Sequence, residues 1–118
     1  MTVETDIYNT LKSLVGNRVF PDVAQLNTER PYITYQQIGG EVTVFTDDSI
    51  PSSENGRFQI NVWTDARTES KQIIKQVEAA LIVSQLFQAR PESAPISTYD
   101  SDTKVYGAMQ DFNIWSDR

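Results

Sequence analysis

The sequence contains neither cysteine nor histidine, and these absences remove several classes of chemistry. Without cysteine there is no disulfide framework and no thiol nucleophile. Because histidine is absent as well, the chain cannot build a Cys/His zinc site or a Ser-His-Asp triad. Long apolar runs are also lacking, since no stretch approaches the roughly 20 residues of a membrane-spanning helix. We therefore expect no Cys/His zinc site, no residue of such a triad and no membrane span.

Basic residues are in the minority, with 10 Lys and Arg against 16 Asp and Glu, for a formal net charge of −6. Proteins that grip phosphate backbones normally carry the opposite sign, so we expect no specific nucleic-acid binding. The acidic N-terminus lacks the basic start and apolar stretch of a signal peptide. With 118 residues, of which 39% are hydrophobic, the chain has room for one domain, residues 1–118. The simplest expectation is a cytoplasmic, non-catalytic domain.

Two segments show the apolar spacing of helices. In residues 3–15, apolar side chains recur three and four positions apart, which predicts a helix with one buried face. A second helix is expected after Thr64 or Asp65, either of which can cap its first turn. Its end stays open from the sequence, because apolar residues continue past Leu81 as far as Ala89.

Strands are predicted where β-branched and aromatic residues cluster or alternate with polar ones. These segments are residues 32–38, 41–45, 57–63, 95–100 and 105–115. Residues 46–56 (TDDSIPSSENG) form a polar loop that we expect to be mobile, with the acidic side chains Asp47, Asp48 and Glu54. Grouped strands joined by short turns indicate an α+β fold, a mainly antiparallel β-sheet with two helices packed on one face.

Alternation along residues 57–63 and 105–115 leaves one side of each strand polar. The outward set comprises Arg57, Gln59, Asn61, Trp63, Asp111, Asn113 and Trp115. Tryptophan is enriched at interface hot spots, so this side of the sheet is expected to form part of a subunit contact. A second interpretation stays open, in which both indoles fold over the sheet edge into the core, since tryptophan is commonly mostly buried.

Two acidic clusters could bind a cation, but both are better explained without one. Asp47, Asp48 and Glu54 offer carboxylate oxygens, but their loop lacks the spaced ligands of a dedicated site. Residues 100–102 (DSD) begin like a calcium loop, yet Val105 stands where such a loop requires glycine. We favour a solvated loop for the first cluster and a turn for the second.

Four fragments occur in an order and spacing that resemble one known family. They are LVGNRVFPDV (residues 14–23), RPYITYQ (30–36), RFQINVW (57–63), and a closing hairpin (99–107) followed by QDFNIW (110–115). Each fragment alone has a composition that is common in strands. Together, the fragments cover most of residues 14–115. In this order they are similar to the tail completion proteins of long-tailed bacteriophages, also described as tail terminators or head-to-tail joining proteins.

This resemblance implies a structural protein of the virion tail, with no catalysis and no cofactor. Such proteins form a ring, commonly of six subunits, on the head-proximal end of the tail tube and present a surface to the head connector. Assembly in the cytoplasm of a bacterial host is implied, and an acidic subunit suits a channel through which DNA passes without sticking. The alternative is a small ligand-sensing or regulatory binding module that dimerises through its sheet, which predicts a concave apolar pocket.

Overall fold

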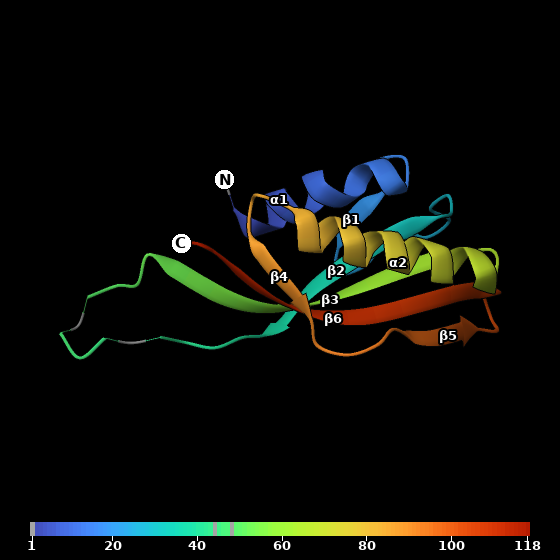
Figure 1. Ribbon diagram of the computed structural model, residues 1–118. Helices are drawn as coiled ribbons and strands as arrows, with labels where there is room; N and C mark the ends of the chain where they lie inside the picture. Colours follow the sequence, from blue (N-terminus) through green and yellow to red (C-terminus); the bar gives the residue numbers. More distant parts are fainter. Residues whose placement is uncertain (1, 44, 48) are drawn as a thin grey trace.

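The computed structural model describes residues 2–43, 45–47 and 49–118. In chain order, the elements are α1 (Val3–Leu11), a 3₁₀ turn (Lys12–Leu14), β1 (Val19–Pro21), β2 (Tyr32–Gly39), β3 (Ser53–Thr64), α2 (Arg67–Val83), β4 (Gln88–Pro91), β5 (Ile96–Asp100) and β6 (Val105–Asp117). Both helices lie on the same face of the sheet (Figure 1). The expected α+β fold is confirmed. Neither described helix combines the length and apolar character needed to cross a membrane.

The six strands form one sheet in the order β1-β2-β3-β6-β4. β5 also pairs with β6, and it does so along the same edge as β4. β4 pairs with the C-terminal half of β6, whereas β5 pairs with its first five residues. All pairings are antiparallel except that of β1 with β2. The short β1 therefore lies at one edge of the sheet, a position that tolerates Pro21, which has no backbone N–H to donate.

Alternation along the two central strands builds the core beneath the helices. The inward residues of β3 and β6 include Phe58, Ile60, Val62, Phe112 and Ile114, each no more than 1% exposed. They belong to one apolar cluster with Ile7 and Leu11 of α1 and Ile73 and Val77 of α2. Burying one such side chain contributes about 1.5–3 kcal/mol. The predicted packing of both helices against one face is thus confirmed.

The start of α2 differs from the prediction. Its N-cap is Ala66, in extended conformation and with no side-chain cap hydrogen bond. The two expected caps are engaged elsewhere: the Thr64 hydroxyl donates to the Ala66 carbonyl at 2.7 Å, and the Asp65 carboxylate accepts from the Arg30 guanidinium. The predicted cap is wrong because both candidate side chains have other partners.

The end of α2 falls between the two positions that the sequence left open. The helix ends at Val83, and the chain then turns into β4. Phe87 lies in this connection and Ala89 lies in β4, and both belong to the core cluster. The apolar residues beyond Val83 therefore reflect this packing and not a longer helix. Pairing with β6 is what converts this stretch into a strand.

The connection between β2 and β3 departs most from expectation. None of the described residues in the range 41–45 lies in a strand, so the predicted strand there is wrong. β3 begins at Ser53, so Glu54, Asn55 and Gly56 lie in a strand and not in the predicted loop. Residues 53–56 are held by pairing with residues 114–117 of β6. Asp48 lies outside the described residues.

We call residues 40–43, 45–47 and 49–52 the β2–β3 arm. It projects away from the helices and the centre of the sheet at one end of the molecule (Figure 1). The principal extents of the molecule are 53 × 25 × 22 Å, so the chain is about twice as long as it is wide.

Candidate subunit interface on the helix-free face

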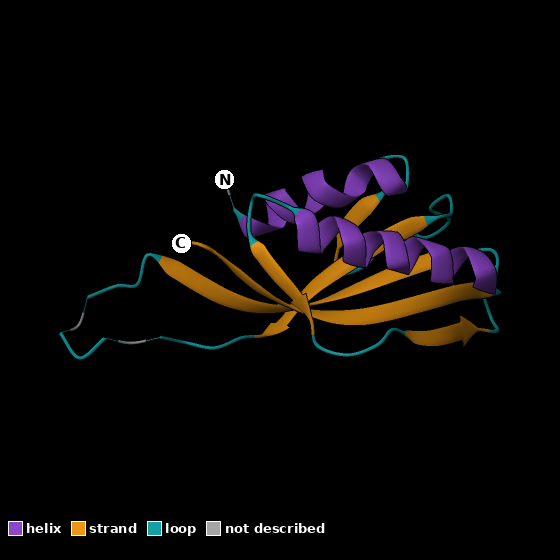
Figure 2. Ribbon diagram, viewed as in Figure 1, coloured by secondary structure: helices purple, strands orange, loops and turns teal. Residues whose placement is uncertain are grey.

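The face of the sheet opposite the helices carries the residues singled out from the sequence. Alternation directs Arg57, Gln59, Asn61, Trp63, Asp111, Asn113 and Trp115 away from the core cluster. In the strand register, Arg57 lies opposite Asn113, and Gln59 lies opposite Asp111. Figure 2 shows both helices on the other side of the sheet, and no helix of the described chain covers this side. We call it the helix-free face.

Trp63 does not fold over the sheet edge into the core, which was the second of the two interpretations that the sequence allowed. It is half-buried, and it is not part of the core cluster. Its indole N–H donates to the Thr34 hydroxyl at 3.2 Å, and its ring lies against Gly107 of β6. The indole therefore stays on the helix-free face and spreads over the neighbouring strands β2 and β6.

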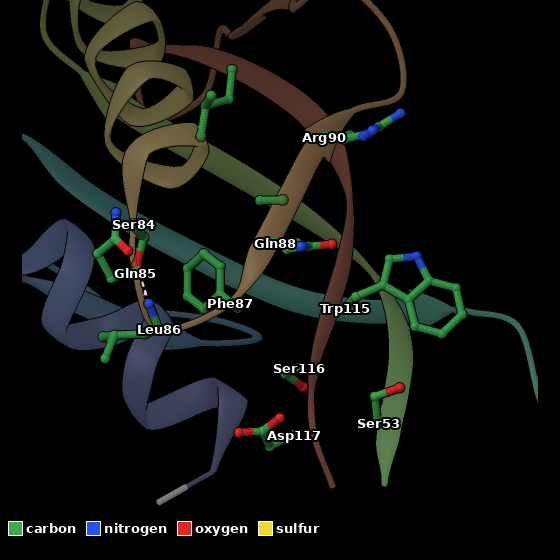
Figure 3. A pocket seen from close by; sticks show the side chains of 12 residues that line it. Ser53, Ser84, Gln85, Leu86, Phe87, Gln88, Arg90, Trp115, Ser116 and Asp117 are labelled. Atoms are coloured by element: carbon green, nitrogen blue, oxygen red, sulfur yellow. Dashed lines mark hydrogen bonds between the residues drawn. The ribbon is translucent and has the colours of Figure 1, made fainter. Parts of the chain in front are cut away.

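Trp115 is also half-buried and marks the far end of the helix-free face. It lies between Asn55 of β3 and Gln88 of β4 in the strand register. Its side chain borders a cavity of about 770 Å³ that Ser53 and Arg90 also line (Figure 3). This cavity sits at the β4 edge of the sheet, where the α2–β4 connection meets the C-terminal half of β6.

Hydrogen bonds between polar side chains order the centre of the helix-free face. Asn61 donates to the Gln59 side-chain oxygen at 3.4 Å, and Asn55 donates to the side-chain oxygen of Asn113. Asn61 is only 9% exposed, so it offers a partner little surface. Gln59, Asp111 and Asn113 are half-buried, so each offers a partner part of its side chain, and Arg57 is exposed.

Two arginines flank Asn113, and the sequence singled out only one of them. Arg57 of β3 and Arg90 of β4 are each paired with Asn113 in the register, so all three lie in one row across the sheet. Both arginines are exposed, and neither has a carboxylate within 4.0 Å among the described residues. We call these three residues the arginine row. Arg90 was missed because its segment could not be assigned to a strand without its pairing to β6.

The acidic residues considered for a cation do not gather. The Asp47 carboxylate accepts hydrogen bonds from the Ser49 hydroxyl at 2.7 Å and the Ser49 N–H at 3.0 Å, and these bonds lower its pKa. Glu54 lies in β3 and pairs with Arg118 at 3.8 Å. Asp100 accepts from the Asp102 N–H, which makes this segment a turn. Across residues 2–43, 45–47 and 49–118, no group of three or more such side chains could hold a metal ion.

Comparison with known proteins identifies related folds and a family for this chain. A chain in a solved structure titled "Virion of native gene transfer agent (GTA) particle" shares the fold, with a TM-score of 0.59. It is 18% identical, and the match covers 95% of this chain and 92% of that chain. No curated protein matches the sequence. The family model described as "Tail completion protein gp17" matches residues 8–117, and the chain therefore belongs to this family of structural phage tail proteins.

Proposed function

We propose that this tail protein of a phage or prophage closes the head-proximal end of the tail tube as a ring of six subunits and joins it to the head connector. Family membership supports a structural role in the tail, and the fold is shared with a chain of a virion particle. In this proposal the ring assembles in the cytoplasm of the bacterial host and remains in the virion tail. DNA passes through it without specific binding, in keeping with a formal net charge of −6.

The helix-free face is the observation that carries the proposal. It is a broad sheet surface with two half-buried tryptophans and ordered polar side chains, and no described helix covers it. A ring built from identical subunits needs two different patches on each subunit, because its contacts are heterologous. The helix-free face supplies one patch, with Gln59, Asp111 and Trp115 as principal contact residues.

The long axis of the molecule suits a subunit that meets a different partner at each end. The β2–β3 arm projects at one end, and the loop between β1 and β2 lies at the other (Figure 1). That loop exposes two apolar side chains, with Val23 80% and Leu26 87% exposed. In our proposal, one end of the ring contacts the tail tube protein and the other contacts the head connector.

The test uses the purified chain together with polymerising tail tube protein. Electron microscopy of negatively stained tubes is expected to show a six-membered ring at one end of each tube and tubes that stop growing. Gln59→Arg is expected to prevent ring formation, since it adds bulk and charge to the helix-free face. It should leave the fold intact, because the new guanidinium lies across from Asp111 in the strand register.

Gln76→Arg is the matched control, because Gln76 is exposed on α2 and away from the helix-free face. Its rings and capped tubes should match those of the wild type. Tubes that grow without a cap in the presence of the wild-type chain would refute the proposed role. A wild-type chain that forms only dimers would instead support a ligand-sensing or regulatory module.

A further inference from the structure

The β2–β3 arm carries apolar side chains that its own chain leaves exposed. Val42 and Ile50 are 87% and 75% exposed, and Phe45 is 46% exposed. The arm's first residues have the β-branched and aromatic composition of a strand, but the described residues there have no strand partner. Exposed apolar side chains gathered on one projecting segment mark a surface that another molecule covers.

The arm and its base are also strongly acidic. Residues 40–54 contain the acidic side chains Glu41, Asp47, Asp48 and Glu54, and no lysine or arginine. Two of these carboxylates already have partners in the same chain: Asp47 accepts hydrogen bonds from Ser49, and Glu54 forms an ion pair with Arg118. The Glu41 backbone N–H donates to the Asn55 side chain at 2.8 Å, which places this residue at the root of the arm. Such an acidic, partly apolar segment is complementary to a surface that is basic and partly apolar.

The β4 edge of the same chain offers such a surface. The residues that line the cavity of about 770 Å³ include the apolar Ile82, Leu86 and Trp115 and the charged Arg90 and Asp117. Ile82 and Leu86 are about half exposed. Figure 3 shows Gln88, Arg90 and Trp115 pointing to the same side of the sheet. Arg57 adds a second positive charge across Asn113, so the cavity opens beside the arginine row.

We propose that the β2–β3 arm of one copy docks into this cavity and onto the arginine row of the next copy around the ring. The inference rests on the proposed ring and names the second of its two patches. The arm projects away from its own body, so its tip is presented to another molecule (Figure 1). Carboxylates of the arm meet guanidinium groups in charge-assisted hydrogen bonds, while its apolar side chains cover Trp115. Arm and cavity differ, so the contact is heterologous and can close into a ring.

Two charge-reversed variants test the contact. Variant one carries Glu41→Lys and Asp47→Lys in the arm, and variant two carries Arg57→Glu and Arg90→Glu in the arginine row. Sedimentation velocity is expected to show rings for the wild type and monomers for each variant alone, because arm and row then repel each other. An equimolar mixture of the two variants is expected to form rings again, since each arm faces a row of opposite charge and an even-numbered ring can alternate them.

The mixture separates docking between copies from docking within one chain. An arm that folds back onto its own row would leave both variants monomeric when mixed, and this result would overturn the inference. Rings formed by either variant alone would overturn it as well, as would a wild-type chain that stays monomeric at every concentration. Arg67→Glu with Lys71→Glu on the exposed side of α2 is the matched control, and it should form rings like the wild type. Thermal melts check that each variant is folded.

The outcomes also separate this inference from the proposed function. If either charge-reversed variant forms rings alone, the proposed arm contact is refuted. Capping of tail tubes by the wild type would still support the role at the tail end. Uncapped tubes would refute that role even where rings form in solution.

Discussion

Trp63 of β3 lies against Gly107 of β6, its directly paired residue, and covers it. A Cβ atom added to Gly107 would approach the Cζ3 atom of the indole to 2.8 Å and the Thr98 hydroxyl oxygen to 2.5 Å. A larger residue would therefore clash at this position, and glycine fits there because it has no side chain. This close approach lets the indole reach Thr34 on the opposite side and keeps it half-buried on the helix-free face.

Gly107→Ala is expected to destabilise the chain by about 1–3 kcal/mol, because the added methyl group overpacks a closed contact. Urea denaturation should show a lower midpoint with an unchanged slope. In the background of Trp63→Leu, the same substitution should cost less, because one of the two clashing groups is gone. Equal costs in the two backgrounds would show that the indole does not confine this position.

Local periodicity predicted which side of each central strand is buried, and it did so because alternation directly reflects burial. The inward side of β3 and β6 is the core, and the seven outward residues share the helix-free face. Helix positions followed for the same reason. The register that sets Trp63 against Gly107 depends on pairing between distant segments, and no local pattern encodes it.

The errors lie where pairing between distant segments overrides local preference. Asn55-Gly56 has the composition of a turn, but pairing with β6 holds it in a strand. Residues 41–45 have strand composition, but the described ones have no strand partner. β4 has only four residues and is defined by its pairing, so Arg90 could not be placed beside Asn113 from the sequence.

Hydrogen-exchange rates are expected to differ between the two parts of residues 46–56 that lie before and after the start of β3. In the isolated chain, amides of the β2–β3 arm are expected to exchange rapidly, because the arm buries little and pairs with no strand. The exceptions are the N–H groups of Glu41 and Ser49, which donate to side-chain oxygens. Ladder amides of Ser53–Thr64 should be protected, including those that the sequence placed in the loop. Strong protection of the arm in the monomer would contradict the prediction.

Ala66 is a position where the chain can be stabilised. As N-cap of α2 it has φ −144° and ψ 143°, the extended conformation of a capping residue, but its side chain offers no acceptor. Ala66→Ser or Ala66→Asp is expected to stabilise the chain by about 0.5–2 kcal/mol, because the new oxygen can accept from the first turn of α2. Thermal unfolding measures the gain. Ala79→Ser, at an exposed position inside α2, is the control and should be neutral or slightly destabilising.

A buried polar residue interrupts the inward side of β6. Gln110 is only 3% exposed and faces α2 among apolar neighbours. Its side-chain amide donates to the Glu78 carboxylate and to the Ser93 carbonyl, both at 2.9 Å. It thereby ties β6 to α2 and to the connection between β4 and β5. The donors of the amide group are what this position needs, because both of its partners are acceptors.

Gln110→Glu replaces those donors with a carboxylate that faces Glu78 and the Ser93 carbonyl. Burial and the like charge are expected to raise the pKa of the new carboxyl above its ordinary value of about 4.3. The folded state then holds a proton that the unfolded state releases, so stability falls as the pH rises above about 4. Near pH 7 the loss should reach about 3–5 kcal/mol, the cost of an uncompensated buried charge.

Denaturation of this variant between pH 4 and pH 8 measures the effect, with each value compared with the wild type at the same pH. Gln110→Met is the control, because it also removes the donors but adds no titrating group. Its cost, of about 1–3 kcal/mol for the acceptors left without a partner, should not change across this range. If Gln110→Glu costs the same at both ends of the range, the new carboxyl has kept its ordinary pKa. That result would show that water reaches the contact between Gln110 and Glu78.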